Sequence, residues 1–352
     1  KTISNGLNLS TDGGLVWIKV RSQAQHHALF DTERGATKYL KSSATSAEAT
    51  RTDTLTSFNS NGFSLGNDSS GALVNTSGQT YASWTFKKKA KFFDVVTWTG
   101  NGTAGRTISH NLGTTVGCVM IKNTSNAENW MVYHIGSGID GQLNLNTNAA
   151  AVDESSQFND TVPSSTVLTL GANSEVNYNG QTYVAYLFAH DTDASSIIKC
   201  GSYTGTGSAN NAVTLGWEPQ WLIVKSASGT GSVQNWDMFD NQRGFSSGST
   251  TGELFPNTTI AERTVSNRMN ATATGFSTGT SSVDEINASG ITYIYMAIRA
   301  ENIPTITYDP NLQWSGGTAP TLPATGETDV ITFNTTDGGT TYKSALAIDG
   351  AK

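Results

Sequence analysis

Few residues of this 352-residue chain have the types and spacing that metal chemistry requires. The five histidines lack the i, i+4 spacing of a zinc site, and the chain has no Cys-x-x-Cys pair that could supply further zinc ligands. Asp191-Thr192-Asp193 could contact calcium, but no glycine and glutamate follow to complete a binding loop. We therefore expect no metal and no cofactor. The histidines are His26, His27, His110, His134 and His190.

Catalytic chemistry is also poorly represented. Gly136-Ser137-Gly138 only loosely resembles the Gly-x-Ser-x-Gly turn that presents a nucleophile. Glycoside hydrolysis needs two carboxyl groups at a defined separation, and the acidic residues lie mostly in turns without an evident pairing. We predict that the chain is not an enzyme, with a polysaccharide depolymerase as an alternative. These acidic residues are Asp153, Glu154, Asp160, Asp191, Asp193, Asp284 and Glu285.

Sugar binding needs no titrating group, because an aromatic face and amide or hydroxyl hydrogen bonds suffice. Trp98 and Tyr203 each stand in a Thr-Gly turn, and Asn101 follows the first of these turns. We therefore take Trp98, Asn101 and Tyr203 as candidate ligand-binding residues. Packing between modules is an equally valid interpretation of both aromatics. Trp130 and Trp236 each follow Asn and are expected in the core.

The composition predicts a polar surface with few charged residues. Only 14% of residues are charged, the formal net charge is -7, and there are 36 glycines. Nucleic-acid binding is disfavoured, because phosphate contacts need clustered Lys and Arg. No apolar run approaches the ~20 residues that span a membrane. Uncharged polar β-proteins are common outside cells, which favours an extracellular location.

Two local features leave alternatives open. The basic run Lys87 to Lys91 could be a solvated edge, a guard against edge-to-edge strand pairing or an anion-binding patch. Cys118 and Cys200 lie in apolar runs, and we expect them to be buried free thiols.

Internal repetition is the strongest pattern in the chain. Val74–Tyr81 recurs as Val176–Tyr183 and again as Ile286–Tyr293, each followed by an apolar run. Short apolar runs separated by Gly, Asn, Asp and Ser turns are typical of β-sandwiches. We predict an all-β fold of tandem, jelly-roll-like sandwich modules that pack end to end. Their ranges are 1–91 (incomplete at its N-terminus), 92–195 and 196–300, followed by a C-terminal tip unit, 301–352.

The repeat is incomplete in two places. Lys1–Ser4 aligns with Arg106–Ser109, so the counterpart of Val95–Gly100 would fall before residue 1. We expect a longer gene product, or a strand that comes from elsewhere. The second module has His134-Ile135-Gly136 where the others have Asp-x-x-Arg-Gly, a segment that we interpret as a structural turn rather than a ligand site.

Turns and helices can be expected at a few positions. Ser10–Trp17 and Thr335–Tyr342 both resemble the Asp-box of sialidases, a structural hairpin remote from catalysis, so we expect a hairpin at each. Asp337-Gly338-Gly339 supports the second. Only Ala47–Arg51 and parts of 259–269 could form a helical turn.

Two stretches resemble a known family. Trp314–Leu322, Asp329–Phe333 and Thr336–Tyr342 are similar to the C-terminal end of bacteriophage tail-fibre proteins. Phe30–Leu40 and Phe58–Phe63 resemble a module of tail-fibre-like proteins of marine bacteriophages. The resemblance implies a repeat-built adhesin of the virion, a homotrimer that contacts other virion proteins and mediates host recognition through a cell-surface glycan.

Other functions remain as alternatives. A decoration or head-fibre scaffold would bind virion proteins and no receptor, and a large apolar groove would favour it. A polysaccharide depolymerase would need a carboxylate pair within about 10 Å in a cleft. A cellular adhesin or surface-layer protein is the third.

Overall fold

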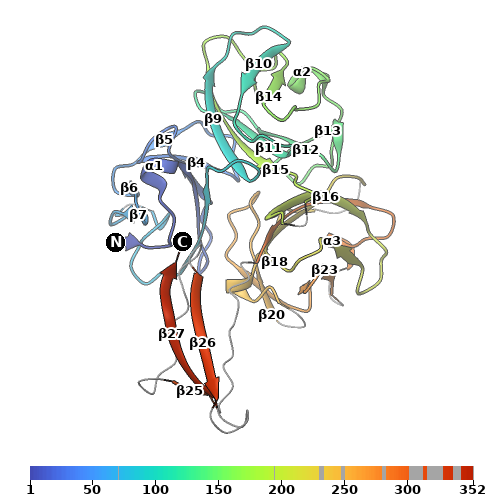
Figure 1. Cartoon of the computed structure of the whole chain (residues 1–352). Coiled ribbons are helices and arrows are strands. Elements are labelled where there is room, and N and C mark those ends of the chain that lie inside the picture. Colours follow the sequence, from blue (N-terminus) through green and yellow to red (C-terminus); the bar gives the residue numbers. More distant parts are fainter. Residues whose placement is uncertain are drawn as a thin grey trace. The chain divides into compact units, whose positions relative to one another are not determined.

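The computed structural model divides the chain into two compact units, residues 1–300 and 301–352 (Figure 1). It describes the first unit except residues 70, 194, 230–233, 247–249 and 280–282. In the second unit it describes three strands, without their side chains. The two units are therefore presented separately. We keep the names first, second and third module for 1–91, 92–195 and 196–300.

The first unit is almost entirely β, a sandwich-type fold of antiparallel sheets, as predicted. In the first module a five-stranded sheet faces a three-stranded sheet. The larger sheet has the order β5 (Ala49–Thr50), β4 (Lys38–Lys41), β3 (Ala28–Asp31), β2 (Gly14–Val20) and β8 (Tyr81–Lys87). The smaller has the order β1 (Thr2–Ile3), β7 (Gly62–Leu65) and β6 (Leu55–Asn59).

The second module also has a five-stranded large sheet, but in it the strand that begins near the recurrent tyrosine has a neighbour on both sides. That sheet has the order β13 (Gly138–Asn144), β12 (Trp130–His134), β11 (Val116–Asn123), β15 (Thr182–Ala189) and β9 (Phe93–Thr99). β10 (Arg106–Ser109) and β14 (Val167–Leu170) pair beside it, and α2 (Ser155–Phe158) is a single turn.

The third module has a four-stranded sheet of the same kind. Its order is β16 (Ile198–Thr204), β24 (Thr292–Arg299), β18 (Pro219–Ser226) and β19 (Asp237–Asp240). The smaller sheets are β17 (Ala212–Thr214), β23 (Gly275–Thr278) and β22 (Met269–Thr272), and the pair β20 (Thr250–Glu253) and β21 (Arg263–Ser266). The helical turns are η1 (Asn241–Arg243) and α3 (Val283–Ile286).

The second unit contains an antiparallel hairpin of β26 (Thr328–Thr335) and β27 (Tyr342–Ala351). β25 (Leu312–Trp314) adds to β27 in parallel, which the sequence did not predict. The turn residues Asp337-Gly338-Gly339 lie outside the described residues.

Alternation along the central strands connects each module to a shared core. Leu15 and Trp17 of β2 join a core built from all three modules, whereas Val16 and Ile18 join the first module's own core. Because both faces of β2 are covered, its side chains are all buried, and the strand reads as a nearly continuous apolar run. β18 divides its residues between two cores in the same way.

The three modules close into a ring through one repeating backbone contact. The accepting carbonyl always lies two residues after the lysine that ends the central strand's apolar run. The donors and acceptors are Glu48 N and Thr124 O (3.0 Å), Ala151 N and Ala227 O (2.9 Å), and Glu262 N and Arg21 O (2.8 Å).

The expected end-to-end packing is therefore wrong, because the third module contacts the first as well as the second. A short linker limits the distance between modules but not the rotation between them, and a head-to-tail contact with the right rotation closes into a ring.

Three local expectations are also wrong. Residues 10–17 form no hairpin. They contain α1 (Leu9–Asp12), whose first turn is capped by the Asn8 side chain accepting from Thr11 N at 3.2 Å, followed directly by β2. The expected helical turns at 47–51 and within 259–269 are instead the strands β5 and β21, because pairing with β4 and β20 outweighs local propensity.

Candidate functional site

The candidate binding residue Trp98 lies in a packed corner of the second module. Its side chain is 8% exposed, and its ring stacks on Tyr183 with centroids 5.5 Å apart and an interplanar angle of 12°. The indole N–H donates to Val176 O at 3.1 Å. These contacts favour packing over ligand binding, although both partners lie within the second module and not across the boundary between modules that the sequence suggested.

Tyr203 occupies the same corner in the third module. It stacks on Tyr293 with centroids 5.2 Å apart and an angle of 14°, and its hydroxyl donates to Ile286 O at 2.6 Å. Trp98 and Tyr203 are thus equivalent packing residues of two corners, and the structure does not bring them into one site.

Asn101 shares the corner of Trp98 but is exposed. Its backbone N–H donates to Asn177 Oδ1 at 3.1 Å, and its own Oδ1 accepts from Asn177 Nδ2 at 3.2 Å. Tyr178, the next residue after buried Asn177, is 55% exposed. The exposed aromatic of this corner is therefore Tyr178, which the sequence did not single out because the other modules have Thr76 and Ala288 there.

The corresponding corner of the first module is open. Tyr81 accepts a hydrogen bond from Thr76 N (2.9 Å) as Tyr183 does from Tyr178 N, yet no described ring stacks on it. Tyr81 is half-buried, whereas Tyr183 and Tyr293 are 1% and 0% exposed. β8 pairs with β2 and, among the described residues, has no strand on its other edge. We use the name open corner for the outer edge of β8 together with Tyr81 and the turn that precedes it.

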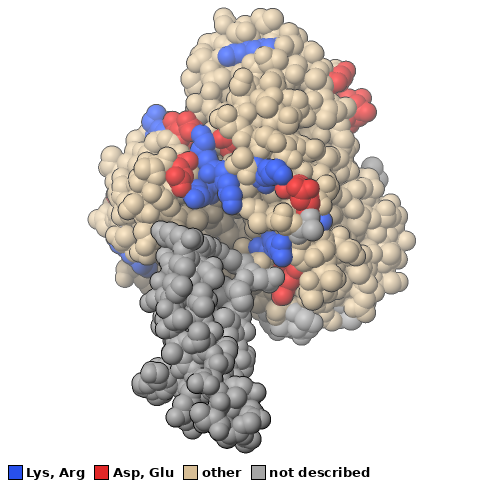
Figure 2. Space-filling model, viewed as in Figure 1, with Lys and Arg blue, Asp and Glu red and all other residues tan. Residues whose placement is uncertain are grey.

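The basic run after β8 is matched by acidic partners. Its described ion pairs support a solvated edge rather than an anion-binding patch. Figure 2 shows one face of the molecule, on which charged side chains are few and acidic groups lie next to basic ones. The pairs are Lys87 with Asp12 (2.9 Å), Lys88 with Glu33 (2.8 Å) and Lys91 with Asp193 (3.1 Å).

Comparison with known proteins places these features in a family. The sequence model of a domain of unknown function, DUF7483, matches residues 2–302. The chain belongs to this family. No curated protein matches the chain, and neither does any solved structure. The DUF7483 match, residues 2–302, covers all three modules of this chain.

A cluster of titratable groups is buried in the third module of the DUF7483 domain. The fully buried Arg268 guanidinium pairs with Asp237 at 3.0 Å and also with Glu253. Burial, together with the neighbouring Glu253 carboxyl, raises the pKa of Asp237 well above its ordinary value. Asp237 and Glu253 are 1% and 0% exposed, so a polysaccharide cannot reach this pair in the described structure. The sequence missed both residues, since nothing in their spacing links β19 to β20.

A buried lysine recurs at one position of every module. Lys19, Lys122 and Lys225 end the central apolar runs and are all 0% exposed. Each Nζ donates to the carbonyl of the next residue, at 2.6, 2.7 and 2.9 Å. Burial lowers the pKa of each of these lysines to about 8.

The interfaces between modules explain why the second module lacks the Asp-x-x-Arg-Gly segment of the other two. Trp84 donates to Asp240 at 2.9 Å, and Tyr186 donates to Asp31 at 2.8 Å, each across an interface. At the third interface Met296 stands where Trp84 and Tyr186 do, and it has no donor. An aspartate there would lack this partner and be costly to bury.

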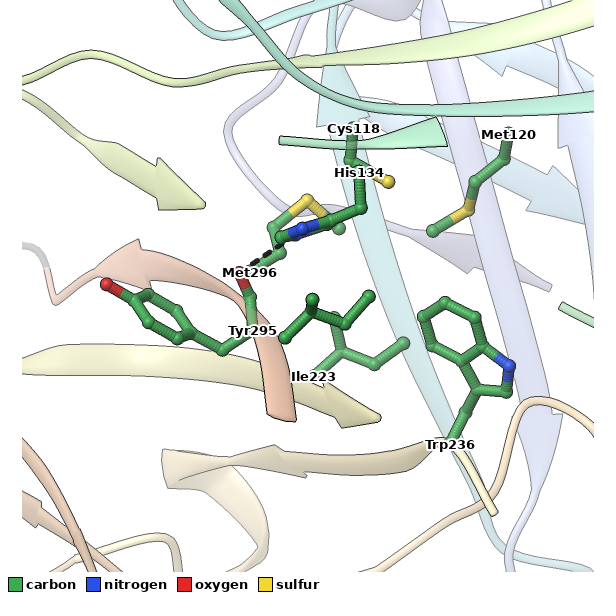
Figure 3. A pocket seen from close by; sticks show the side chains of 8 residues that line it. Cys118, Met120, His134, Ile223, Trp236, Tyr295 and Met296 are labelled. Atoms are coloured by element: carbon green, nitrogen blue, oxygen red, sulfur yellow. Dashed lines mark hydrogen bonds between the residues drawn. The ribbon is translucent and has the colours of Figure 1, made fainter. Parts of the chain in front are cut away.

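The residue present instead is His134, whose Nε2 lies 3.0 Å from Tyr295 O (Figure 3). Cys118, Met120 and Trp236 line a narrow pocket beside it (Figure 3). Burial lowers the pKa of His134 to about 3, so the ring is neutral at ordinary pH. The side chains of Arg34 and Asp31, paired at 2.5 Å, are 4% and 0% exposed, which supports a structural role for the Asp-x-x-Arg turn.

Other expected chemical groups lie as follows. Cys118 and Cys200 are buried free thiols, as predicted, and burial raises the pKa of both. Asp140, Asp153 and Asp160 bring carboxylate oxygens within 4.8 Å of one another on the surface, although all three are exposed. No helix among the described residues is long and apolar enough to cross a membrane.

Proposed function

We propose that the chain is a structural protein of a bacteriophage virion, a tail fibre that recognises a glycan on the host surface. One observation carries the proposal. The exposed aromatic side chain of Tyr178 lies beside the exposed amides of Asn101 and Asn179, whereas the Asp237–Glu253 carboxyl pair is buried. Such a surface suits sugar recognition through hydrogen bonds and aromatic contact.

The resemblance of the C-terminal segment to tail-fibre tips supports the virion assignment. The same resemblance implies that the chain forms a homotrimer and contacts other virion proteins. Three copies would multiply weak glycan contacts and raise avidity by ~10²–10⁴ where the geometry allows simultaneous binding.

The Tyr178 corner is the glycan contact that the structure favours. The exposed Tyr178 ring lies in the turn against which Gly100 packs, next to the exposed amides Asn101 and Asn179. An aromatic platform flanked by amides supplies the two elements that sugar binding uses.

Binding of labelled chain to a panel of candidate host cells tests the proposal. We expect saturable, strain-restricted binding that periodate treatment of the cells abolishes and that Tyr178→Ala weakens at least tenfold. Val162→Ala, which changes another exposed apolar residue of the same module, should leave binding unchanged. No binding to any strain by a chain verified as folded would contradict the proposal.

A decoration or head-fibre scaffold is the second candidate. The open corner favours it, because an unpaired strand edge is a ready site for another protein. In that case the chain would bind virion proteins and no cell.

A further inference from the structure

Among the described residues, the edge strand of the first module, β8, lacks a neighbour that its two counterparts have. β15 lies between β11 and β9, and β24 lies between β18 and β16. β8 pairs with β2 alone in the described part of the chain. Most of β15 and β24 is buried, whereas β8 carries half-buried Tyr81 and Thr85 and exposed Ser83. In the described part of the chain, the side chains of β8 are therefore less covered than those of its two counterparts.

The backbone at this edge is arranged to receive a strand. In the second module Gly100 N donates to Gln181 O (2.7 Å), and Gly180 N donates to Gly100 O (3.0 Å). In the third, Gly205 exchanges the same two bonds with Ile291 and Gly290, at 2.8 and 2.9 Å. The equivalent groups of the first module are Gln79 O and Gly78 N. Because strand residues alternate between neighbours, Tyr81, Ser83 and Thr85 also direct their N–H and C=O groups outward.

Two side chains of the open corner also match those of the filled corners. The face of Tyr81 corresponds to the faces that Trp98 covers on Tyr183 and that Tyr203 covers on Tyr293. Asn75 donates to Gly66 O at 2.5 Å, as its counterpart Asn177 donates to Gly171 O at 3.1 Å. Asn177 Oδ1 in addition accepts the N–H of the residue that follows the Trp-Thr-Gly turn.

The filled corners define what the occupant must be. β9 and β16 with the residue that follows each share the sequence apolar-x-apolar-x-x-aromatic-Thr-Gly, from Phe93 to Gly100 and from Ile198 to Gly205. The final glycine is required by close approach. A Cβ on Gly100 would lie 2.1 Å from Tyr178 O, and one on Gly205 would lie 2.0 Å from Ala288 O.

We propose that the outer edge of β8 is a docking site for an extended partner strand of this sequence type. The strand adds antiparallel to β8, its aromatic side chain covers Tyr81, and its glycine bonds to Gly78 and Gln79. This is β-strand addition, in which the backbone supplies affinity and the side chains supply specificity. The inference does not depend on glycan recognition by the chain.

A peptide with the sequence of residues 92–102, labelled with fluorescein, tests the proposal. Anisotropy titration with the whole chain should show saturable binding, and the same peptide with Gly100→Ala should bind at least tenfold more weakly. Hydrogen exchange should slow at Tyr81, Ser83 and Thr85 when peptide is bound. Absence of binding, or equal binding of the Gly100→Ala peptide, overturns the proposal.

Variants of Ser83 locate the binding. Ser83→Pro removes an outward N–H and should abolish binding, whereas Ser83→Ala should keep it, with thermal unfolding confirming that both are folded. Binding that survives Ser83→Pro would overturn the proposal, because the peptide would then lie elsewhere.

Two other occupants give distinct results, and each would overturn the proposal. Self-association that Ser83→Pro abolishes, without peptide binding to the monomer, would place a second copy at the edge. Slow exchange of the same amides in the monomeric chain without peptide would mean that the chain already fills its own edge.

Discussion

At the residue scale, the buried lysines tie the end of each central strand to the loop that follows. Lys122 Nζ donates to Asn123 O and, at 3.3 Å, to Asn126 O, and it has no ion pair among the described residues. Carbonyl oxygens satisfy the ammonium donors but supply no full negative charge. Burial therefore disfavours the charged form, which is why the pKa falls to about 8.

Replacing Lys122 with methionine should change how stability depends on pH. The unfolded chain keeps this proton up to the ordinary lysine pKa, 10.5, whereas the folded chain loses it near 8. Between these pH values the unfolded state binds more protons at this lysine than the folded state does. The contribution of Lys122 to the free energy of unfolding therefore increases as pH rises. The free energy of unfolding of the wild type, relative to Lys122→Met, should increase by up to about 3 kcal/mol from pH 7.5 to 10.5.

Urea titrations of both proteins at several pH values measure this difference, and the subtraction cancels groups common to both. Val162→Ala, which changes an exposed side chain without a titratable group, is the control and should show no such rise. A difference between wild type and Lys122→Met that is flat across the window would contradict the assignment.

At the element scale, the number of neighbouring strands decides whether a strand accepts a proline substitution. Ser83 of β8 and Ala185 of β15 are equivalent positions with outward N–H groups. In the described part of the chain, Ala185 has a partner on this outer side, Val96 of β9, and Ser83 has none there. Proline removes the N–H and is accepted on edge strands but not in the middle of a sheet.

Ala185→Pro should therefore lower the free energy of unfolding by about 3 kcal/mol or more, whereas Ser83→Pro should cost about 1 kcal/mol or less. Chemical denaturation followed by tryptophan fluorescence measures both. Equal losses at the two positions would indicate that the outer edge of β8 is already paired.

The sequence allowed the strands to be predicted better than the environment of their side chains. β15 and β24 are apolar runs that begin at a recurrent tyrosine and are bounded by turn residues, a local signal. For Trp98, which precedes Thr-Gly, the sequence left ligand binding and packing between modules both open, because its burial depends on Tyr183, 85 positions away. Tyr178 was not predicted as an exposed aromatic, because the exposure of its side chain depends on tertiary packing and has no periodic signal in the sequence of one module.

At the scale of the whole molecule, the ring makes the three modules interdependent. Trp130 and Trp236 donate their indole N–H groups to Lys41 O at 2.9 Å and Asn144 O at 3.1 Å, each in a neighbouring module. The sequence predicted both as core residues, and both are buried. That they belong to the core shared between modules could not be predicted, since the contacts join residues about 90 positions apart and use backbone acceptors. A change at one interface should accordingly weaken all three modules.

Trp236→Phe tests this interdependence. The change keeps an aromatic ring but removes the N–H bonded to Asn144 O and reduces the volume in the shared core, so we expect a loss of about 2 kcal/mol. Hydrogen exchange against denaturant, resolved by module, should show β2, β11 and β18 losing protection at one common, lowered midpoint, because their side chains meet in one core. Val162→Ala, an exposed site, should leave the midpoint unchanged. If β2 kept the wild-type midpoint while β18 unfolded early, the modules would be separate folding units, and the ring contacts would contribute little to stability.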